Sequence, residues 1–346
     1  MKDLTVLVTA CGAEFMPGLA NCLKDNGERA IKIVGTDKQN DGTMLQIVDV
    51  FYQVPSVQDP NYVDALLDIC KKESVDVLLP FMSAELLALI KRQSEFEKIG
   101  TKVSVSDPKS VEITTNKYKF YEFLKNNGIN TPKYAKVSKW SELRQACFEC
   151  GYPKNGVCVK ATELNGSRGI RVINPNLSRF DILFNEKPSS FLTTLDDLES
   201  VLKERGTMPE MMAMEYLPGI EGSVDLIADN GRILYMAYRE STVNLHSIPQ
   251  LAVIKENKEA FNIATKVISA LGLSGSADLD FKEDINGHPV LMEINPRLAA
   301  TLRIFKEGGL NLPYLRVKQL LGEDLPKITI KNNVTMRRRY LESFSK

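Results

Sequence analysis

The sequence predicts an α/β domain with a doubly wound parallel sheet, followed by a region richer in strands. The first 110 residues alternate short runs rich in β-branched side chains with helix-like segments, a rhythm typical of βαβ units. The strand-rich pattern begins after residue 130, and 346 residues are enough for two or three domains. We expect domains at 1–112, 113–325 and 326–346, the last a C-terminal strand or tail.

The first domain is expected to hold four buried parallel strands, at 4–9, 30–37, 75–81 and 102–107. Helix-like segments at 17–27 and 60–74 lie between them. Asp107-Pro108 is expected to end this domain.

The second region is expected to begin with a helix at 114–128, which Thr115 or Asn116 can cap and Gly128 can stop. The least regular part is 180–206, which ends in a polar helix. The other expected elements are strands at 157–161, 170–173, 211–217, 222–229 and 232–238, helices at 257–271 and about 307–322, and a hairpin at 277–295.

Composition excludes several classes of protein. The formal net charge is zero, without the basic excess that a nucleic-acid-binding surface needs. The longest apolar tract, 75–90, contains Pro80 and Glu85 and is too short for a membrane span, so we expect a cytoplasmic protein with no membrane contact. Cys147 and Cys150 form a C-x-x-C without a second ligand pair, in a helix-like stretch, which favours ordinary core cysteines over zinc or redox chemistry.

The hairpin "ADLDFKEDINGHPVLMEINPRL" (277–298) places acids where strands normally carry apolar residues. Asn286-Gly287 predicts a two-residue type I′ turn. Counting outward from that turn puts Asp280 opposite Glu293 and Asp278 opposite Asn295. All of these side chains then share one face of the hairpin, and the apolar residues between them face a core.

Two carboxylates directly opposite each other destabilise a sheet, and a divalent cation removes the conflict. Asp280, Glu293 and Asn295 would supply oxygen ligands to Mg²⁺, with Mn²⁺ as an alternative, and Arg297 can reach an anion near the metal. The competing interpretation is a solvated polar face whose carboxylates are held apart by water.

Cations elsewhere in the chain could meet phosphates. Lys160 lies in the apolar strand "VCVKA", where a buried lysine needs a partner. The loop at 165–169, with Gly166 and Gly169, offers backbone N–H groups to phosphate, although an ordinary flexible hairpin would have the same composition. Lys117 begins a helix and could equally be an exposed helix lysine.

Four segments in order carry a family resemblance: "NKYKFYEFLKNNGINTP", "CVKATELNGSRGIRVI", "MEYLPGIEGSVD" and "DLDFKEDINGHPVLMEINPR". Across residues 114–300 the chain resembles the ATP-grasp superfamily, in particular one ATP-grasp unit of the carbamoyl-phosphate synthase large subunit, with biotin carboxylase a more distant relative. The preceding α/β region looks like the family's Rossmann-like pre-ATP-grasp domain. The resemblance implies an ATP-grasp fold of two α+β subdomains that clamp ATP, with a small lid subdomain at about 130–210.

The resemblance also implies residue roles. Asp280, Glu293 and Asn295 would hold Mg²⁺, and Arg297, with Lys160, would act on the reacting phosphoryl group. ATP itself would be bound by Lys117, Lys160, Ser167, Arg168, Gly169, Glu215, Tyr216, Leu217 and Glu221. Asp280 stands where carbamoyl-phosphate synthases carry glutamine. One copy of the unit and no amidotransferase segment are present, so a complete carbamoyl-phosphate synthase is not expected.

The function expected from this resemblance is an ADP-forming ligase that activates a carboxylate as an acyl-phosphate for attack by an amine or a thiol. Its partners would be small molecules, and a homodimer stays open. Arg239 and Arg303 are candidates for binding the substrate carboxylate, against surface salt bridges as the alternative. His246 is expected in a loop, and the arginine run at 337–339 is expected to be solvated. The role of Asp278 is left open.

Two other functions compete. A nicotinamide-dependent oxidoreductase would use the first domain, with Gly12, Gly18 and Asp37, but "TACGAEFMPG" lacks G-x-G-x-x-G. A non-catalytic ATP-binding subunit is the other alternative. The presence of Lys160, Glu293, Asn295 and Arg297 disfavours it.

Overall fold

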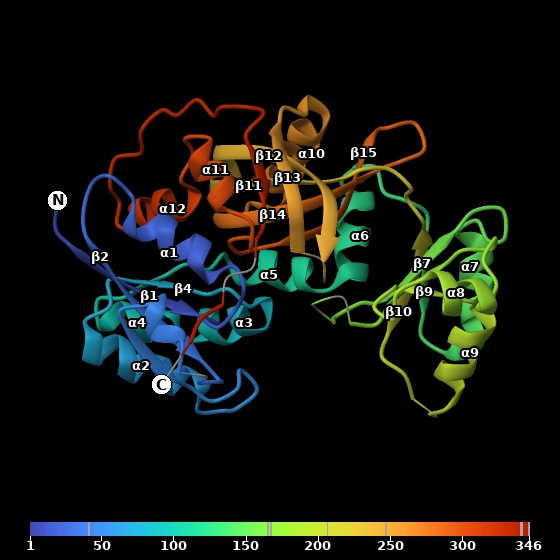
Figure 1. Cartoon of the computed structure of the whole chain (residues 1–346), viewed down its shortest axis with the longest axis horizontal. Coiled ribbons are helices and arrows are strands. Elements are labelled where there is room, and N and C mark those ends of the chain that lie inside the picture. Colours follow the sequence, from blue (N-terminus) through green and yellow to red (C-terminus); the bar gives the residue numbers. More distant parts are fainter. Residues whose placement is uncertain are drawn as a thin grey trace. The chain divides into compact units, whose positions relative to one another are not determined.

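The computed structural model describes residues 1–40, 42–164, 166, 168–205, 207–245, 248–339 and 342–344. The chain forms two compact units that interleave along the sequence (Figure 1). The first unit contains Met1–Thr114, Glu221–Phe281 and Glu293–Lys346, and the second contains Thr115–Ile220 and Lys282–Met292. The expected domains 1–112, 113–325 and 326–346 are continuous stretches of sequence, whereas each compact unit is built from separate stretches.

The N-terminal part of the first unit is a five-stranded parallel sheet of order β3-β2-β1-β4-β5, which confirms the predicted fold of this region. Side chains alternate between two cores: Val6 and Val8 pack with α1, and Leu7 packs with α2 on the other face. The elements are β1 (Leu4–Thr9), α1 (Met16–Lys24), β2 (Ile31–Asp37), η1 (Met44–Gln46), β3 (Val50–Gln53), α2 (Tyr62–Glu73), β4 (Val77–Leu79), α3 (Ser83–Lys91), α4 (Gln93–Lys98) and β5 (Lys102–Val103).

The end of this region differs from the prediction. The run at 102–107 forms a strand only at Lys102–Val103, and Pro108 begins helix α5 (Pro108–Thr115). Proline suits the first position of a helix because its missing N–H would have no intrahelical partner there. Pro108 is therefore a helix start.

The second unit contains a five-stranded sheet of order β6-β10-β7-β8-β9. Helices α7, α8 and α9 lie along one side of it (Figure 1), and its core contains Leu143 and Cys147 of α7 and Leu198 of α9. Asn116 caps the first helix of the unit, as predicted, by accepting a hydrogen bond from Lys119 N. The elements are α6 (Lys117–Asn126), β6 (Tyr134–Val137), η2 (Trp140–Glu142), α7 (Leu143–Glu149), β7 (Val157–Ala161), β8 (Ile170–Ile173), α8 (Arg179–Asn185), β9 (Leu192–Thr193), α9 (Leu195–Lys203) and β10 (Met211–Glu215).

Cys147 and Cys150 are buried free thiols, one within α7 and the other at its C-terminal end. Burial raises the pKa of each thiol to about 12, so neither is a thiolate at neutral pH. This is the behaviour of ordinary core cysteines.

A third sheet has the order β15-β14-β11-β12-β13-β16. Helix α10 packs on it through Ala264, Val267 and Ile268. The expected helix at about 307–322 is two shorter helices, α11 and α12. The elements are β11 (Glu221–Asp229), β12 (Arg232–Leu245), β13 (Ile248–Lys255), α10 (Lys258–Leu271), β14 (Gly275–Glu283), β15 (Pro289–Asn295), α11 (Arg303–Glu307), α12 (Leu312–Leu320) and β16 (Thr335–Arg337). No helix among the described residues is long and apolar enough to cross a bilayer.

Helix α12 joins the C-terminal part of the first unit to the N-terminal sheet through charged contacts. The Tyr314 hydroxyl donates to Glu28 Oε2 (2.9 Å) and accepts from Arg29 Nε (2.9 Å). Lys318 Nζ donates to the same Glu28 oxygen (2.8 Å). These contacts explain how segments about 290 residues apart belong to one compact unit.

The N-terminal cap of helix α10, which packs on the third sheet, allows a test of stability. The Asn257 side chain caps the helix by accepting a hydrogen bond from Ala260 N (3.0 Å). We expect Asn257→Ala to lower the free energy of unfolding by about 1 kcal/mol, because a helix N–H loses its partner. Chemical denaturation followed by circular dichroism measures this. Asn257→Ser keeps a capping oxygen and should stay close to wild type; equal losses in both variants would contradict the capping role.

Candidate active site

One face of the third sheet carries polar side chains on four strands. In the antiparallel β11–β12 pair, Ser223 lies opposite Arg239 and Glu221 opposite Ser241. Because side chains alternate, Asp225 shares this face as the diagonal neighbour of Arg239. Two further strands, β14 and β15, bring the acids of the hairpin to the same sheet.

The hairpin turn differs from the prediction. Asp284 N donates to His288 O (2.9 Å) and Gly287 N donates to Asp284 O (3.1 Å), which makes a three-residue loop with Gly287 at φ +83°. The predicted type I′ turn would also need a positive φ at Asn286, which Asn286 does not have. The Asp284 carboxylate explains the difference, because its Oδ1 accepts from the N–H groups of Asn286 (2.8 Å) and His288 (2.9 Å).

The metal-ligand candidates nevertheless meet. Asn295 Nδ2 lies 3.4 Å from Asp280 Oδ2, and Ser223 Oγ donates to Asp280 Oδ1 (2.7 Å). Burial, with Asp278 and Glu293 nearby, raises the pKa of Asp280 well above its usual range. On the other face, Leu279 and Phe281 are buried, as the alternation predicts.

These residues fit a hard divalent cation. Asp225, Asp278 and Asp280 interact electrostatically with Arg239, Arg297 acts on Asp225, and Glu293 acts on Asp280. Full ionisation would leave an excess of two negative charges, which is the charge of one Mg²⁺, and the donor set is all oxygen. Among the described residues, no three His, Cys, Asp or Glu side chains form a metal cluster, and the expected set contains only two acids beside Asn295.

Arg239 lies inside the sheet, not at an open surface. Its side chain is 5% exposed, Nε is 3.4 Å from Asp225 Oδ2, and Nη2 is 3.8 Å from Asp278 Oδ1. Nη1 donates to Ser241 Oγ (3.1 Å). Burial works against the charged form, but Asp225 and Asp278 raise the pKa of Arg239 above its usual value. The buried carboxylates therefore hold this guanidinium, which had been a candidate for binding substrate.

Ser223 and Asp225 had not been singled out in the sequence. Both are buried, at 3% and 1% exposure, in strand β11, whose other buried residues are glycine or apolar. Polar residues at alternating positions 221, 223 and 225 of "EGSVD" were the available signal. That pattern places a polar stripe on one face of a strand, which points to a site in a buried sheet.

In the second unit, the two lysines predicted to contact phosphate are both largely buried, at 9% exposure for Lys117 and 5% for Lys160. Lys117 begins α6, and its Nζ donates to Leu164 O (2.9 Å). Lys160 lies in β7, with Nζ 5.4 Å from the centre of the Tyr121 ring. An aromatic face partly offsets the burial of an ammonium group.

The glycine loop is partly described. Gly166 and Gly169 have positive φ values of +64° and +70°, and a Cβ on Gly169 would come within 2.9 Å of Ala161 Cβ. Glycine is therefore required at 169. Arg168 follows Gly166 in the loop. Asn165 and Ser167, and His246 elsewhere in the chain, lie outside the described residues.

The segment expected to read adenine follows β10. Glu215 N donates to Lys133 O (2.8 Å) and Tyr216 N donates to Gly156 O (3.1 Å), so both of these N–H groups bond within the protein. Leu217 is buried, and Lys282 Nζ lies over the Tyr216 ring. Glu221, the residue expected at the ribose, is exposed at the start of β11 in the first unit.

Two further candidates form local contacts. Arg303, on α11, pairs with Glu307 (3.3 Å), and both side chains are about half exposed, which matches the surface salt bridge considered as its alternative. Asp37 accepts from Gly12 N (3.0 Å) through Oδ2 and from Gln39 N (3.0 Å) through Oδ1. In the oxidoreductase interpretation Asp37 would bind the ribose of a dinucleotide. Here its carboxylate holds the backbone of the first βα turn.

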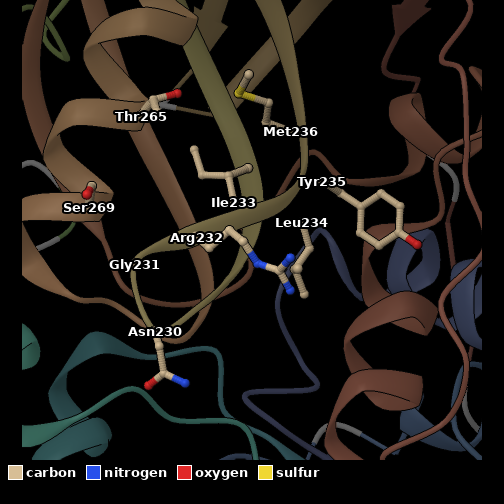
Figure 2. Close-up of a pocket in the computed structure, with 9 residues that line it drawn as sticks. All are labelled: Asn230, Gly231, Arg232, Ile233, Leu234, Tyr235, Met236, Thr265 and Ser269. Atoms are coloured by element: carbon tan, nitrogen blue, oxygen red, sulfur yellow. The ribbon is translucent and has the colours of Figure 1, made fainter.

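Figure 2 shows a pocket at the turn between β11 and β12, and its lining includes none of the acids described above. It is lined by residues 230–236 and by Thr265 and Ser269 of α10. Arg232 is its one charged residue, and it has no carboxylate. We therefore place the candidate site on the acidic face.

The pKa of Asp225 makes a pH-dependent prediction. Burial and the nearby Asp278 raise it from 3.8 to about 7 despite Arg239. Between these values the folded state keeps a proton that the unfolded state has lost, so this carboxyl group's contribution to stability falls as the pH rises. For this single proton, the free energy of unfolding can fall by at most about 1.4 kcal/mol per pH unit.

Asp225→Asn cannot ionise, so its stability relative to wild type should increase between about pH 4 and pH 7. Denaturation curves across that range measure the difference. Asp229→Asn, at an exposed acid on the same strand, is the matched control for loss of a carboxyl group. A difference between Asp225→Asn and wild type that does not change with pH would contradict the assignment.

Comparison with known families and proteins agrees with this architecture. Residues 6–104 match the family described as PylC-like, N-terminal domain, and residues 207–343 match ATP-grasp in the biosynthetic pathway with Ter operon. The carbamoyl phosphate synthase large chain of Clostridium acetobutylicum is 25% identical over 321 residues. That alignment covers 88% of this chain but 27% of the relative, so the chain spans about a quarter of the length of that protein.

Solved structures share the fold. A biotin carboxylase–βγ-ATP complex from Campylobacter jejuni has a TM-score of 0.70 at 18% identity, covering 96% of this chain and 74% of that one. N5-carboxyaminoimidazole synthetase from Staphylococcus aureus, complexed with ADP, has a TM-score of 0.69 at 16% identity, covering 93% and 78%. Residues 207–343 thus resemble an ATP-grasp domain and residues 6–104 a PylC-like N-terminal domain, and the solved structures share the fold of the chain.

Proposed function

We propose that the chain is an ATP- and Mg²⁺-dependent ligase that activates a substrate carboxylate as an acyl-phosphate, which an amine then attacks. The observation that carries this proposal is the oxygen-ligand set of Asp280, Glu293 and Asn295, with Arg297 two residues beyond it. The similarity to carbamoyl phosphate synthase, and to solved structures in complex with βγ-ATP or ADP, supports the nucleotide.

Each proposed role follows from the chemistry of the side chain. Asp280, Glu293 and Asn295 would hold Mg²⁺, which when bound neutralises phosphate charge. An ammonium group suits phosphate oxygens, so the largely buried Lys117 and Lys160 would bind the phosphates. Backbone groups at 215–217 would bind adenine and Glu221 the ribose, while Ser167, Arg168 and Gly169 would close on the phosphates.

The reaction needs charge neutralisation more than it needs a protein nucleophile. The substrate carboxylate oxygen forms a bond to the γ-phosphorus, and the bond to the β–γ bridging oxygen breaks, which releases ADP. The amine nitrogen then attacks the acyl carbon, phosphate leaves with the electron pair, and the amine loses a proton. Arg297 and the lysines reduce repulsion between the carboxylate and the triphosphate.

An amine acceptor gives a C–N bond, and a thiol would follow the same sequence of steps. The test is a screen for ADP release with pairs of carboxylates and amines, with mass spectrometry of the product. We expect ADP release that requires ATP, Mg²⁺ and both organic substrates. ATP hydrolysis that ignores the carboxylate, or tight NAD binding without ADP release, would overturn the proposal.

Glu293→Ala should reduce Mg²⁺-dependent ADP release to background while leaving the fold intact. The variant removes a metal ligand and also relieves the repulsion between Asp280 and Glu293, so the metal-free protein should be no less stable than wild type. Steady-state assays and thermal unfolding without divalent ions measure the two effects.

Glu204→Ala, at an exposed acid after α9, is the control and should keep wild-type turnover. Marked destabilisation of metal-free Glu293→Ala would show that the two carboxyl groups do not repel each other. Retained turnover in this variant would remove Glu293 from the proposed metal site.

A further inference from the structure

Asp278 lies between two guanidinium groups, each facing a different oxygen of its carboxyl group. Arg297 Nη1 is 3.5 Å from Oδ2, and Arg239 Nη2 is 3.8 Å from Oδ1. Asp278 is buried, at 5% exposure. Neither the metal set nor the proposed nucleotide contacts include this residue.

The contacts form a charged row that runs from the interior toward the surface. Asp225, at its inner end, is 3.4 Å from Arg239 Nε. Arg239 then faces Asp278, and Asp278 faces Arg297, whose side chain is 20% exposed. The outermost member is thus the arginine proposed to act on the phosphoryl group.

We propose that Asp278 is a positioning residue that orients Arg297, and that Arg239 is the counter-charge that holds Asp278 from the other side. This inference rests on the proposed ligase function for its meaning in catalysis. Its structural content, the restraint of one guanidinium group by one carboxylate, does not depend on the substrates.

The geometry supports this role because both described contacts of the Arg297 guanidinium use the same nitrogen. Nη1 is 3.5 Å from Asp278 Oδ2 and donates to Leu298 O (3.0 Å). A guanidinium group has five N–H donors in a fixed fork. Holding one nitrogen therefore sets the direction of the others, which can then face an anion.

Asp278 would also keep Arg297 away from the metal ligands. Asp280 and Glu293 lie on the same face, and a flexible arginine would be attracted to either of them. An arginine bound there would neutralise the carboxylates that Mg²⁺ needs. Arg239 acts on the other side of Asp278. Its positive charge balances the negative charge of Asp225 and Asp278, which are buried away from solvent.

The direct test measures the Arg297 side chain by NMR, using protein labelled with ¹⁵N and ¹³C at arginine. Arg297→Lys identifies its signals by their loss. In wild type we expect separate Nη signals, because the contacts slow rotation about the Nε–Cζ bond. In Asp278→Asn these signals should average, whereas Ser276→Ala, at a buried polar residue on the same strand, should leave them unchanged.

Asp278→Glu is the second variant, since it keeps the charge beside Arg239 if Asp278→Asn fails to fold. It moves the carboxylate by one methylene group and should change the Arg297 signals. Arg239→Lys should partly average the separate Nη signals of Arg297. Unchanged Arg297 signals in folded Asp278→Asn, or in Asp278→Glu, would overturn the proposal.

The kinetic arm uses a substrate pair found in the ADP-release screen. Asp278→Asn should lower kcat by about 10- to 100-fold, the scale of a misplaced catalytic group, with the KM for ATP changed far less. In an Arg297→Lys background the same change should have little further effect, because Asp278 acts through Arg297. Additive losses would indicate a general structural role and would contradict positioning.

The two arms separate the two proposals. If no substrate pair supports ADP release, the ligase proposal fails, and the NMR measurement still decides whether Asp278 orients Arg297. If ADP release is found but Arg297 stays restrained in Asp278→Asn, the positioning proposal fails alone.

Discussion

Carboxyl groups that share one face of a buried sheet require cations within a few ångströms, and the first unit is organised around that requirement. Asp225 and Asp278 are each less than 10% exposed, and Arg239 lies between them. An isolated buried charge would be strongly unfavourable, so these side chains stabilise the sheet only as a set. The four acids outnumber the two arginines, and this excess of negative charge supports the proposed divalent ion on the same face.

The N-terminal sheet was largely predictable because its signals are local. Short apolar runs marked four of its five strands, and both cores follow from alternation within those runs. Strand β3, "VFYQ", was missed because four partly exposed residues give too short a pattern. The hairpin turn was predicted wrongly because the Asp284 side chain competes with the preference of Asn-Gly for a type I′ turn.

The candidate site was predictable to the extent that one hairpin contains it. Asp280, Glu293 and Asn295 lie on two consecutive strands, so their proximity follows from chain direction and alternation. Asp225 and Arg239 lie on another strand pair, and nothing in the local sequence states that β11 pairs with β14. The role of Asp278 depends on that non-local pairing, which explains why the sequence assigned it none.

The β14–β15 hairpin passes from one compact unit to the other and back. The boundary falls between Phe281 and Lys282 on the outgoing strand and between Met292 and Glu293 on the returning strand. Asp280 and Glu293, the two acids proposed as metal ligands, both lie in the first unit, within two residues of these boundaries. An ion held by both side chains would link the outgoing strand to the returning strand, so metal binding would restrain the two strands within the first unit where they leave it and re-enter it.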